Sequence, residues 1–115
     1  MGSVHSQRAF PGASPYAATK GAVETLTGVL AAELGPDGVR VNAICPGGVD
    51  TPMLAQGAEE EDMDVDEFLD RVASFSPNGR IATPEDVASL VVFLASEAAQ
   101  HINGTAIPLD GGLAA

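Results

Sequence analysis

Two residues near the start of the chain have the types and the spacing for proton-transfer chemistry. Tyr16 and Lys20 are the only tyrosine and the only lysine among the 115 residues, and they lie four positions apart. On a helix this spacing places both side chains on one face, where they can approach each other and a shared ligand. A free tyrosine has a pKa of about 10, and a cation within about 4 to 6 Å lowers the pKa of a phenol by about 1 to 3. The pair therefore indicates either a phenol primed for acid/base catalysis or an ordinary surface pair.

The charge balance and the hydropathy of the chain exclude several classes of protein. Sixteen acidic residues stand against five basic ones, a net charge of -11, which repels phosphate backbones and anionic lipid headgroups. The longest apolar run, Val87 to Ala95, is interrupted by Ser89 and is far shorter than the roughly 20 residues that cross a bilayer. We therefore expect neither nucleic-acid binding nor a membrane partner.

The cysteine and the histidines give no pattern of a metal site. Cys45 is the only cysteine, so no internal disulfide can form, and His5 and His101 lie far apart in the sequence. Metal sites need several such ligands at suitable spacing. We expect no bound metal, a buried apolar role for Cys45, structural roles for both histidines, and a reducing, cytoplasmic location.

The tyrosine and the lysine are expected on a long helix. Ser14 can cap this helix and Pro15 can occupy its first position, and the apolar pattern continues to Leu34. Gly35 can take the left-handed conformation and Pro36 cannot continue a helix, so the helix is expected to end there. Its apolar residues cover more than one narrow stripe, which predicts contacts on two sides, one of them with a partner chain.

Two strands are predicted, one on each side of a second helix. Residues Val39 to Cys45 form a short β-branched run with apolar residues on both faces, typical of a buried parallel strand. The second strand is Thr105 to Leu109, and its Pro108 cannot donate to a ladder, which favours a sheet edge. A strand, helix, strand order predicts a right-handed crossover in a parallel sheet.

The segment between the strands is expected to be helical and charged. The run "EEEDMDVDEFLDRVASF" predicts one short acidic helix with flexible ends, within a lid at about residues 52–77. Thr83 followed by Asp86 resembles a capping box, which predicts the start of the second strong helix.

Three blocks of the sequence together resemble the short-chain dehydrogenase/reductase family. They are "SPYAATKGAVETLTGVLAAELGPDGVRVNAICPGGVDTPM", "GRIATPEDVASLVVFLAS" and "INGTAIPLDGG". The resemblance covers nearly all of the chain and the C-terminal half of a typical member. It implies an α/β fold, the C-terminal part of a Rossmann-like doubly wound parallel sheet, with two clear strands and about three helices in a single partial domain, residues 1–115.

The resemblance also implies a role for each residue that matches the family's pattern. Tyr16 is similar to the family's acid/base, which exchanges a proton with the oxygen of the substrate. Lys20 is similar to the lysine that lowers the pKa of that tyrosine and bonds the nicotinamide ribose. Ser3, thirteen residues before Tyr16, falls where the family keeps the serine that holds the substrate oxygen.

The turn "PGGVDT" resembles the segment that the family places against the nicotinamide ring. Pro46 and Gly47 would let the backbone approach the cofactor closely. The resemblance gives the backbone of Val49 a bond to the carboxamide and the Thr51 hydroxyl a bond to the carboxamide or the pyrophosphate. The implied cofactor is NAD or NADP, which the sequence does not distinguish.

Two functions are expected from these observations. The first is hydride transfer between a nicotinamide cofactor and a small alcohol or ketone substrate, in a homo-oligomer. No glycine-rich phosphate-binding turn precedes Ser3, so the isolated chain is expected to be inactive. The alternative is a non-catalytic module that associates with itself or with a full-length relative.

Overall fold

The computed structural model describes all 115 residues as an α/β fold with four α-helices and a two-stranded parallel sheet, which confirms the predicted fold class. No helix is both long enough and apolar enough to cross a membrane. Three short 3-10 turns connect these elements, η1, η2 and η3. The helices are α1 (Ser14–Leu34), α2 (Pro52–Glu60), α3 (Val65–Ser74) and α4 (Pro84–Ala95), the strands are β1 (Ala43–Pro46) and β2 (Ala106–Leu109), and the turns are Val4–Ser6, Gly35–Asp37 and Glu97–Ala99.

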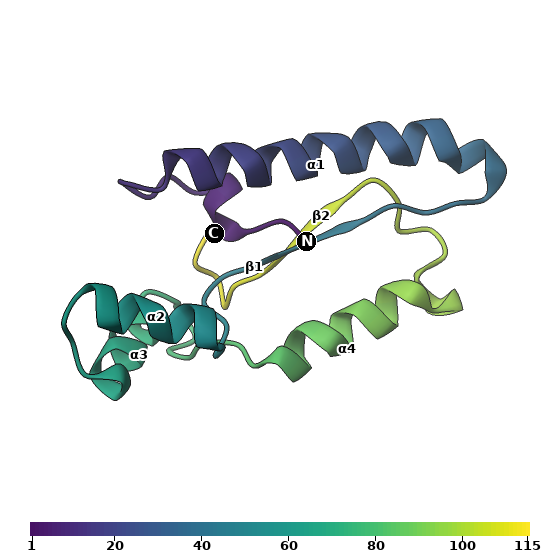
Figure 1. Cartoon of the computed structure of the whole chain (residues 1–115). Helices are drawn as coiled ribbons and strands as arrows, with labels where there is room; N and C mark the ends of the chain where they lie inside the picture. Colours follow the sequence, from purple (N-terminus) through teal and green to yellow (C-terminus); the bar gives the residue numbers. More distant parts are fainter.

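The two strands lie between two layers of helix. Figure 1 shows α1 on one side of β1 and β2 and α4 on the other, with α2 and α3 grouped at one end. The strands are parallel, with Ala43 opposite Ala106 and Pro46 opposite Leu109. A small core forms where α4 meets the sheet, made of Ile44, Leu94, Ala99 and the partly buried Leu90, Ile102, Ile107 and Leu109. The molecule is elongated, 51 × 28 × 24 Å, with a Cα radius of gyration of 15.4 Å.

The first strand begins later than its sequence predicts. The apolar run suggested Val39 to Cys45, whereas β1 spans Ala43–Pro46. Two asparagines explain the difference. The side chain of Asn103 accepts from the N–H of Val41 at 2.8 Å, and the side chain of Asn42 donates to the carbonyl of Ile102 at 2.9 Å. A side chain therefore replaces the ladder acceptor for the N–H of Val41, while the carbonyl of Val41 still accepts from the N–H of Gly104 at 2.8 Å.

Helix α1 starts one residue before the predicted Pro15 and ends at the predicted Leu34, but its caps differ from the prediction. Its N-cap residue is Ala13, which makes no side-chain capping bond, so the predicted capping role of Ser14 is wrong. At the other end Gly35 keeps a right-handed conformation (φ -55°), and the chain continues through η2 to Gly38. Gly38 takes the left-handed conformation (φ 78°) expected of Gly35. Pro36 does not end the helical structure at once. It lies in the first turn of η2, where a residue's N–H has no hydrogen-bond partner within the helix, so the missing N–H of proline costs nothing.

The acidic run contains α3 and only the last two residues of α2, most of which lies before the run, so the chain has four helices in place of about three. Thr51 caps α2 by accepting from the N–H of Leu54, and Asp64 caps α3 by accepting from the N–H groups of Asp66 and Glu67. Between the two helices Asp62 has a positive φ of 50°, a conformation that aspartate tolerates better than most residues. The one helix predicted in the acidic run is therefore α3, and α2 is a helix that the sequence did not predict.

The capping box predicted at the start of α4 is confirmed. The Thr83 side chain accepts from the N–H of Asp86, and the Asp86 carboxylate accepts from the N–H of Thr83. The Asp86 carboxylate also pairs with the guanidinium of Arg80 at 2.8 Å. This cluster fixes the direction in which the chain enters α4.

Candidate active site

Tyr16 and Lys20 lie on one face of the first two turns of α1, as their spacing predicts. The Nζ atom of Lys20 is 5.5 Å from the centre of the Tyr16 ring. The tyrosine side chain is 43% exposed, so a ligand can reach its hydroxyl. Lys20 also donates to the carbonyl oxygen of Met1 at 3.2 Å, which ties the start of the chain to α1.

Ser3 is buried beside this pair, in the segment that leads into η1. Its Oγ accepts from the N–H of His5 at 3.3 Å and lies 3.2 Å from His5 Nδ1. The imidazole of His5 meets the Tyr16 ring edge-on, with ring centres 5.3 Å apart, and packs against Phe10. Burial lowers the pKa of His5, which favours the neutral imidazole. His5 therefore connects the serine to the tyrosine.

Nothing in the sequence indicated this contact role for His5. The only signal was its position two residues after Ser3, a separation at which a short 3-10 turn returns the side chain toward the serine. No group of three or more His, Cys, Asp or Glu side chains could hold a metal ion.

The loop after β1 brings the other predicted residues to the same region. The N–H of Gly47 donates to the carbonyl of Leu109 at 3.0 Å, and a Cβ at Gly47 would lie 3.1 Å from Asp110. This close approach to Asp110, just after β2, disfavours a side chain at position 47. Thr51 donates to the carbonyl of Val49 at 3.3 Å, whereas the N–H of Val49 donates to no acceptor in the chain.

One open cavity of about 720 Å³ connects these elements, a size typical of small-molecule sites. All seven predicted site residues line it: Ser3, Tyr16, Lys20, Pro46, Gly47, Val49 and Thr51. Met53, Leu54, Val72 and Phe75, from the segment between β1 and α4, also line it, and most of its wall is apolar. The cavity offers a few polar groups on an apolar surface, the usual composition of a site for a small organic ligand.

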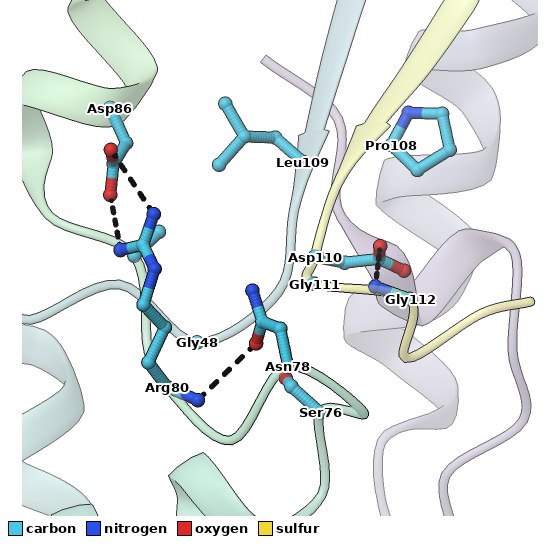
Figure 2. Close-up of a pocket in the computed structure, with 11 residues that line it drawn as sticks. Gly48, Ser76, Asn78, Arg80, Asp86, Pro108, Leu109, Asp110, Gly111 and Gly112 are labelled. Carbon is cyan, nitrogen blue, oxygen red and sulfur yellow. Dashed lines mark hydrogen bonds and ion pairs between the residues drawn. The ribbon is translucent and has the colours of Figure 1, made fainter.

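A second, polar cavity of about 420 Å³ lies between the end of β2 and the start of α4. Figure 2 shows that Arg80 faces Asp86 and that Asn78 lies beside Gly111. The Asp110 carboxylate accepts from the N–H of Gly112 at 3.0 Å. Because its charged groups pair within the chain, this cavity offers no free group comparable to the phenol and the amine of the first.

Comparisons with known proteins agree with this arrangement. A family model described as enoyl-(acyl carrier protein) reductase matches residues 1–114. Short-chain reductase protein NovJ of Streptomyces niveus is 46% identical over 105 residues, 91% of this chain and 40% of NovJ.

Solved structures give the same result. The aldohexose dehydrogenase of Thermoplasma acidophilum, in ligand-free form, superposes with a TM-score of 0.92 at 37% identity, covering 97% of this chain and 45% of the dehydrogenase. An actinorhodin polyketide ketoreductase variant with NADPH gives 0.91 at 34% identity, covering 98% of this chain and 45% of the ketoreductase.

The chain therefore spans less than half the length of the proteins that it matches. The match nevertheless includes nearly every residue of the chain, in sequence and in structure. The chain belongs to the short-chain dehydrogenase/reductase family.

Proposed function

We propose that residues 1–115 supply the proton-transfer side of a nicotinamide-dependent oxidoreductase that interconverts an alcohol and a carbonyl compound. The observation that carries the proposal is the single cavity lined by Ser3, Tyr16, Lys20 and the loop after β1. Family membership supports the reaction class, since NovJ is a reductase by name and the Thermoplasma protein a dehydrogenase.

In this proposal the Tyr16 hydroxyl gives a proton to the substrate oxygen during reduction and takes it back during oxidation. The Ser3 hydroxyl holds the same oxygen by a hydrogen bond. The ammonium of Lys20, 5.5 Å from the ring of Tyr16, stabilises negative charge on the phenol oxygen as the proton leaves.

The residues of the cavity fit a nicotinamide cofactor, NAD or NADP. The free N–H of Val49 is a donor of the kind that a carboxamide oxygen needs, beside Pro46, Gly47 and the Thr51 hydroxyl. Lys20 is the residue that would bond the ribose. When bound, the cofactor supplies the hydride that the protein itself cannot provide. The ketoreductase solved with NADPH supports a cofactor of this class.

The substrate is proposed to be a small alcohol or carbonyl compound with an apolar portion. Met53 and Leu54 of α2 and Phe75 beyond α3 contribute apolar wall to the cavity, and they lie in the segment 52–77 that we propose as a lid. Such a wall favours apolar groups beside the reacting oxygen.

The test is the Tyr16→Phe variant of the native polypeptide that carries residues 1–115, assayed with NADH and NADPH and a panel of ketones. We expect kcat to fall by about 100-fold or more with little change in KM, because only proton transfer is lost. Thr25→Ala, on an exposed position of α1 outside the cavity, serves as the control and should retain full activity. Equal activity of Tyr16→Phe and the wild type, or an inactive wild type, would overturn the proposal.

A second candidate function for the isolated chain is association with itself or with a full-length relative. The observation that favours it is exposed apolar surface on two helices. Val91, Val92 and Phe93 of α4 and Leu26 and Val29 of α1 are all at least 44% exposed. Each strand also has a neighbour on one side only, which leaves edges able to pair. Light scattering should then give a mass above that of a monomer, and Val92→Glu should lower it, whereas a monomer mass would contradict this candidate.

A further inference from the structure

Glu24 lies one helical turn after Lys20 on α1, on the face that also carries Tyr16. Its Oε1 accepts hydrogen bonds from the Ser6 hydroxyl and, at 3.2 Å, from the Cys45 thiol. Ser6 is the last residue of η1, and Cys45 lies in β1. One carboxylate therefore joins three elements around the candidate active site.

The segment that contains Ser3 has little structure of its own. Turn η1 has three residues, too few to hold its orientation without contacts from outside. The N–H of Ser6 donates to the carbonyl oxygen of Ser3 at 3.1 Å, so the residue that bonds Glu24 is tied directly to the serine. On the other side of the serine, Lys20 donates to the carbonyl of Met1.

The two ends of this segment are thus held by neighbouring turns of one helix, and Ser3 lies between them. The same helix presents Tyr16 one turn before Lys20. The position of the serine relative to the phenol depends on these two attachments, on the packing of His5 against the Tyr16 ring, and on the bond from the N–H of Gly2 to the carbonyl of Ile44 at 2.8 Å. Lys20 already has a proposed role in the reaction, whereas Glu24 has not yet been given a role.

We infer that Glu24 is a positioning residue, which holds the Ser3 segment against α1 through Ser6 and so fixes the Ser3 hydroxyl relative to the Tyr16 hydroxyl. The inference rests on the proposed function. Misplacement of a catalytic group by about 1 Å can cost about 100-fold in rate, so loss of this attachment should lower turnover more than substrate binding.

The kinetic test compares Glu24→Leu and Glu24→Gln in the native polypeptide that carries residues 1–115. We expect kcat of Glu24→Leu to fall by about 10- to 100-fold with KM nearly unchanged. Glu24→Gln should recover part of the loss, because its amide oxygen can still accept from Ser6. Glu33→Gln is the matched control, since Glu33 is exposed on the same helix, and it should match the wild type.

A spectroscopic test on the 115-residue chain does not depend on activity. Cys45 is the only cysteine, so the S–H stretch in the Raman spectrum reports one thiol. We expect this band to move to higher frequency in Glu24→Leu, because the S–H···O hydrogen bond is lost, and to stay in place in Glu33→Gln. Circular dichroism verifies that each variant is folded.

The outcomes separate this inference from the proposed function. An S–H band that does not move in folded Glu24→Leu would show that Glu24 does not bond Cys45. The placement of the carboxylate between Cys45 and Ser6 would then be wrong, which would overturn the inference. A band that moves while kcat stays at the wild-type value would show a purely structural contact and also overturn it. Full activity of Tyr16→Phe would overturn the proposed function and with it the positioning role, although the S–H band would still report the contact.

Discussion

The Cys45 thiol is fully buried between β1 and α1, which confirms the expected buried role. Burial, with the neighbouring Glu24 carboxylate as the next cause, raises the pKa of Cys45 to about 11 from its ordinary value of 9.0. Burial disfavours the thiolate because it removes the thiolate from water, and the Glu24 carboxylate disfavours it by charge repulsion. The thiol is therefore protonated at neutral pH and is a poor nucleophile.

This raised pKa predicts a loss of stability in alkali. Cys45 ionises near pH 9.0 in the unfolded chain and only near pH 11 in the folded chain. The contribution of the protonated thiol to the free energy of unfolding is therefore complete below pH 9 and is lost as the pH rises to 11. The urea midpoint of the wild type should fall over this interval. The Cys45→Ala variant lacks this titrating group, so its urea midpoint should decrease less over the same interval. Equal decreases in both proteins would contradict the prediction.

At the scale of single residues, spacing within the sequence identified the Tyr16 and Lys20 pair but not the residues that contact it. Tyr16 and Lys20 are one turn apart, so helix geometry alone brings them together. Glu24 was not identified because its partners, Ser6 and Cys45, are 18 and 21 residues away, and only the packing of η1 and β1 on α1 makes them neighbours. His5 was missed because a turn of three residues has no recognisable periodicity.

Among the elements, α4 begins with a cluster whose strength depends on pH. The Arg80 guanidinium, with the N–H of Thr83 as a further donor, lowers the pKa of Asp86 to about 2 from its ordinary value of 3.8. A depressed pKa in the folded state means that the stabilisation is present above the unfolded pKa and is lost as the pH falls toward the folded one.

The Asp86→Asn variant should therefore melt at a lower temperature than the wild type at pH 7. The difference in melting temperature between the variant and the wild type should shrink between pH 4 and pH 2, where the wild-type carboxylate becomes protonated. Glu85→Gln, which changes a neighbouring exposed acidic residue, should leave the melting temperature nearly unchanged. A difference that persists at pH 2 would show that the carboxylate charge is not its cause. Thermal melts followed by circular dichroism provide the measurement.

The contact between α2 and α3 depends on a glycine. A Cβ at Gly57 would lie 2.6 Å from Cζ of Phe68, which is buried. Gly57→Ala should therefore destabilise the chain by about 1 to 3 kcal/mol, because the ring must move. Gly28→Ala in α1 meets no atom within 4 Å and should stabilise it by about 0.5 to 1 kcal/mol. Urea unfolding of both variants gives the comparison, and a stable Gly57→Ala variant would refute the proposed packing.

The existence of the main elements could be predicted from the sequence, whereas several boundaries could not. The capping box of Thr83 and Asp86 is local, and the sequence located the start of α4 correctly. The start of β1 depends on Asn103, which is 62 residues from Val41, so no local pattern could reveal it. The division of the acidic segment depends on Asp64 as a cap, and the surrounding acidic residues obscured that signal.

For the whole molecule, the two-stranded sheet limits what the isolated chain can bind. The cavity holds the residues proposed to contact the nicotinamide end of the cofactor, but the chain has no glycine-rich turn at a helix N-terminus to receive the phosphates. We predict that NADH and NADPH titrated into the 115-residue chain give no saturable fluorescence change at micromolar concentrations. Saturable binding in that range would contradict the prediction.

The elongated shape affects how the size of the molecule must be measured. A compact chain of 115 residues has a radius of gyration of about 13 Å, whereas this one has 15.4 Å. A single copy will therefore tumble and diffuse more slowly than a sphere of its mass. On a sizing column calibrated with spherical standards it would elute early and could be mistaken for a dimer. The mass must therefore be determined by a method that does not depend on shape.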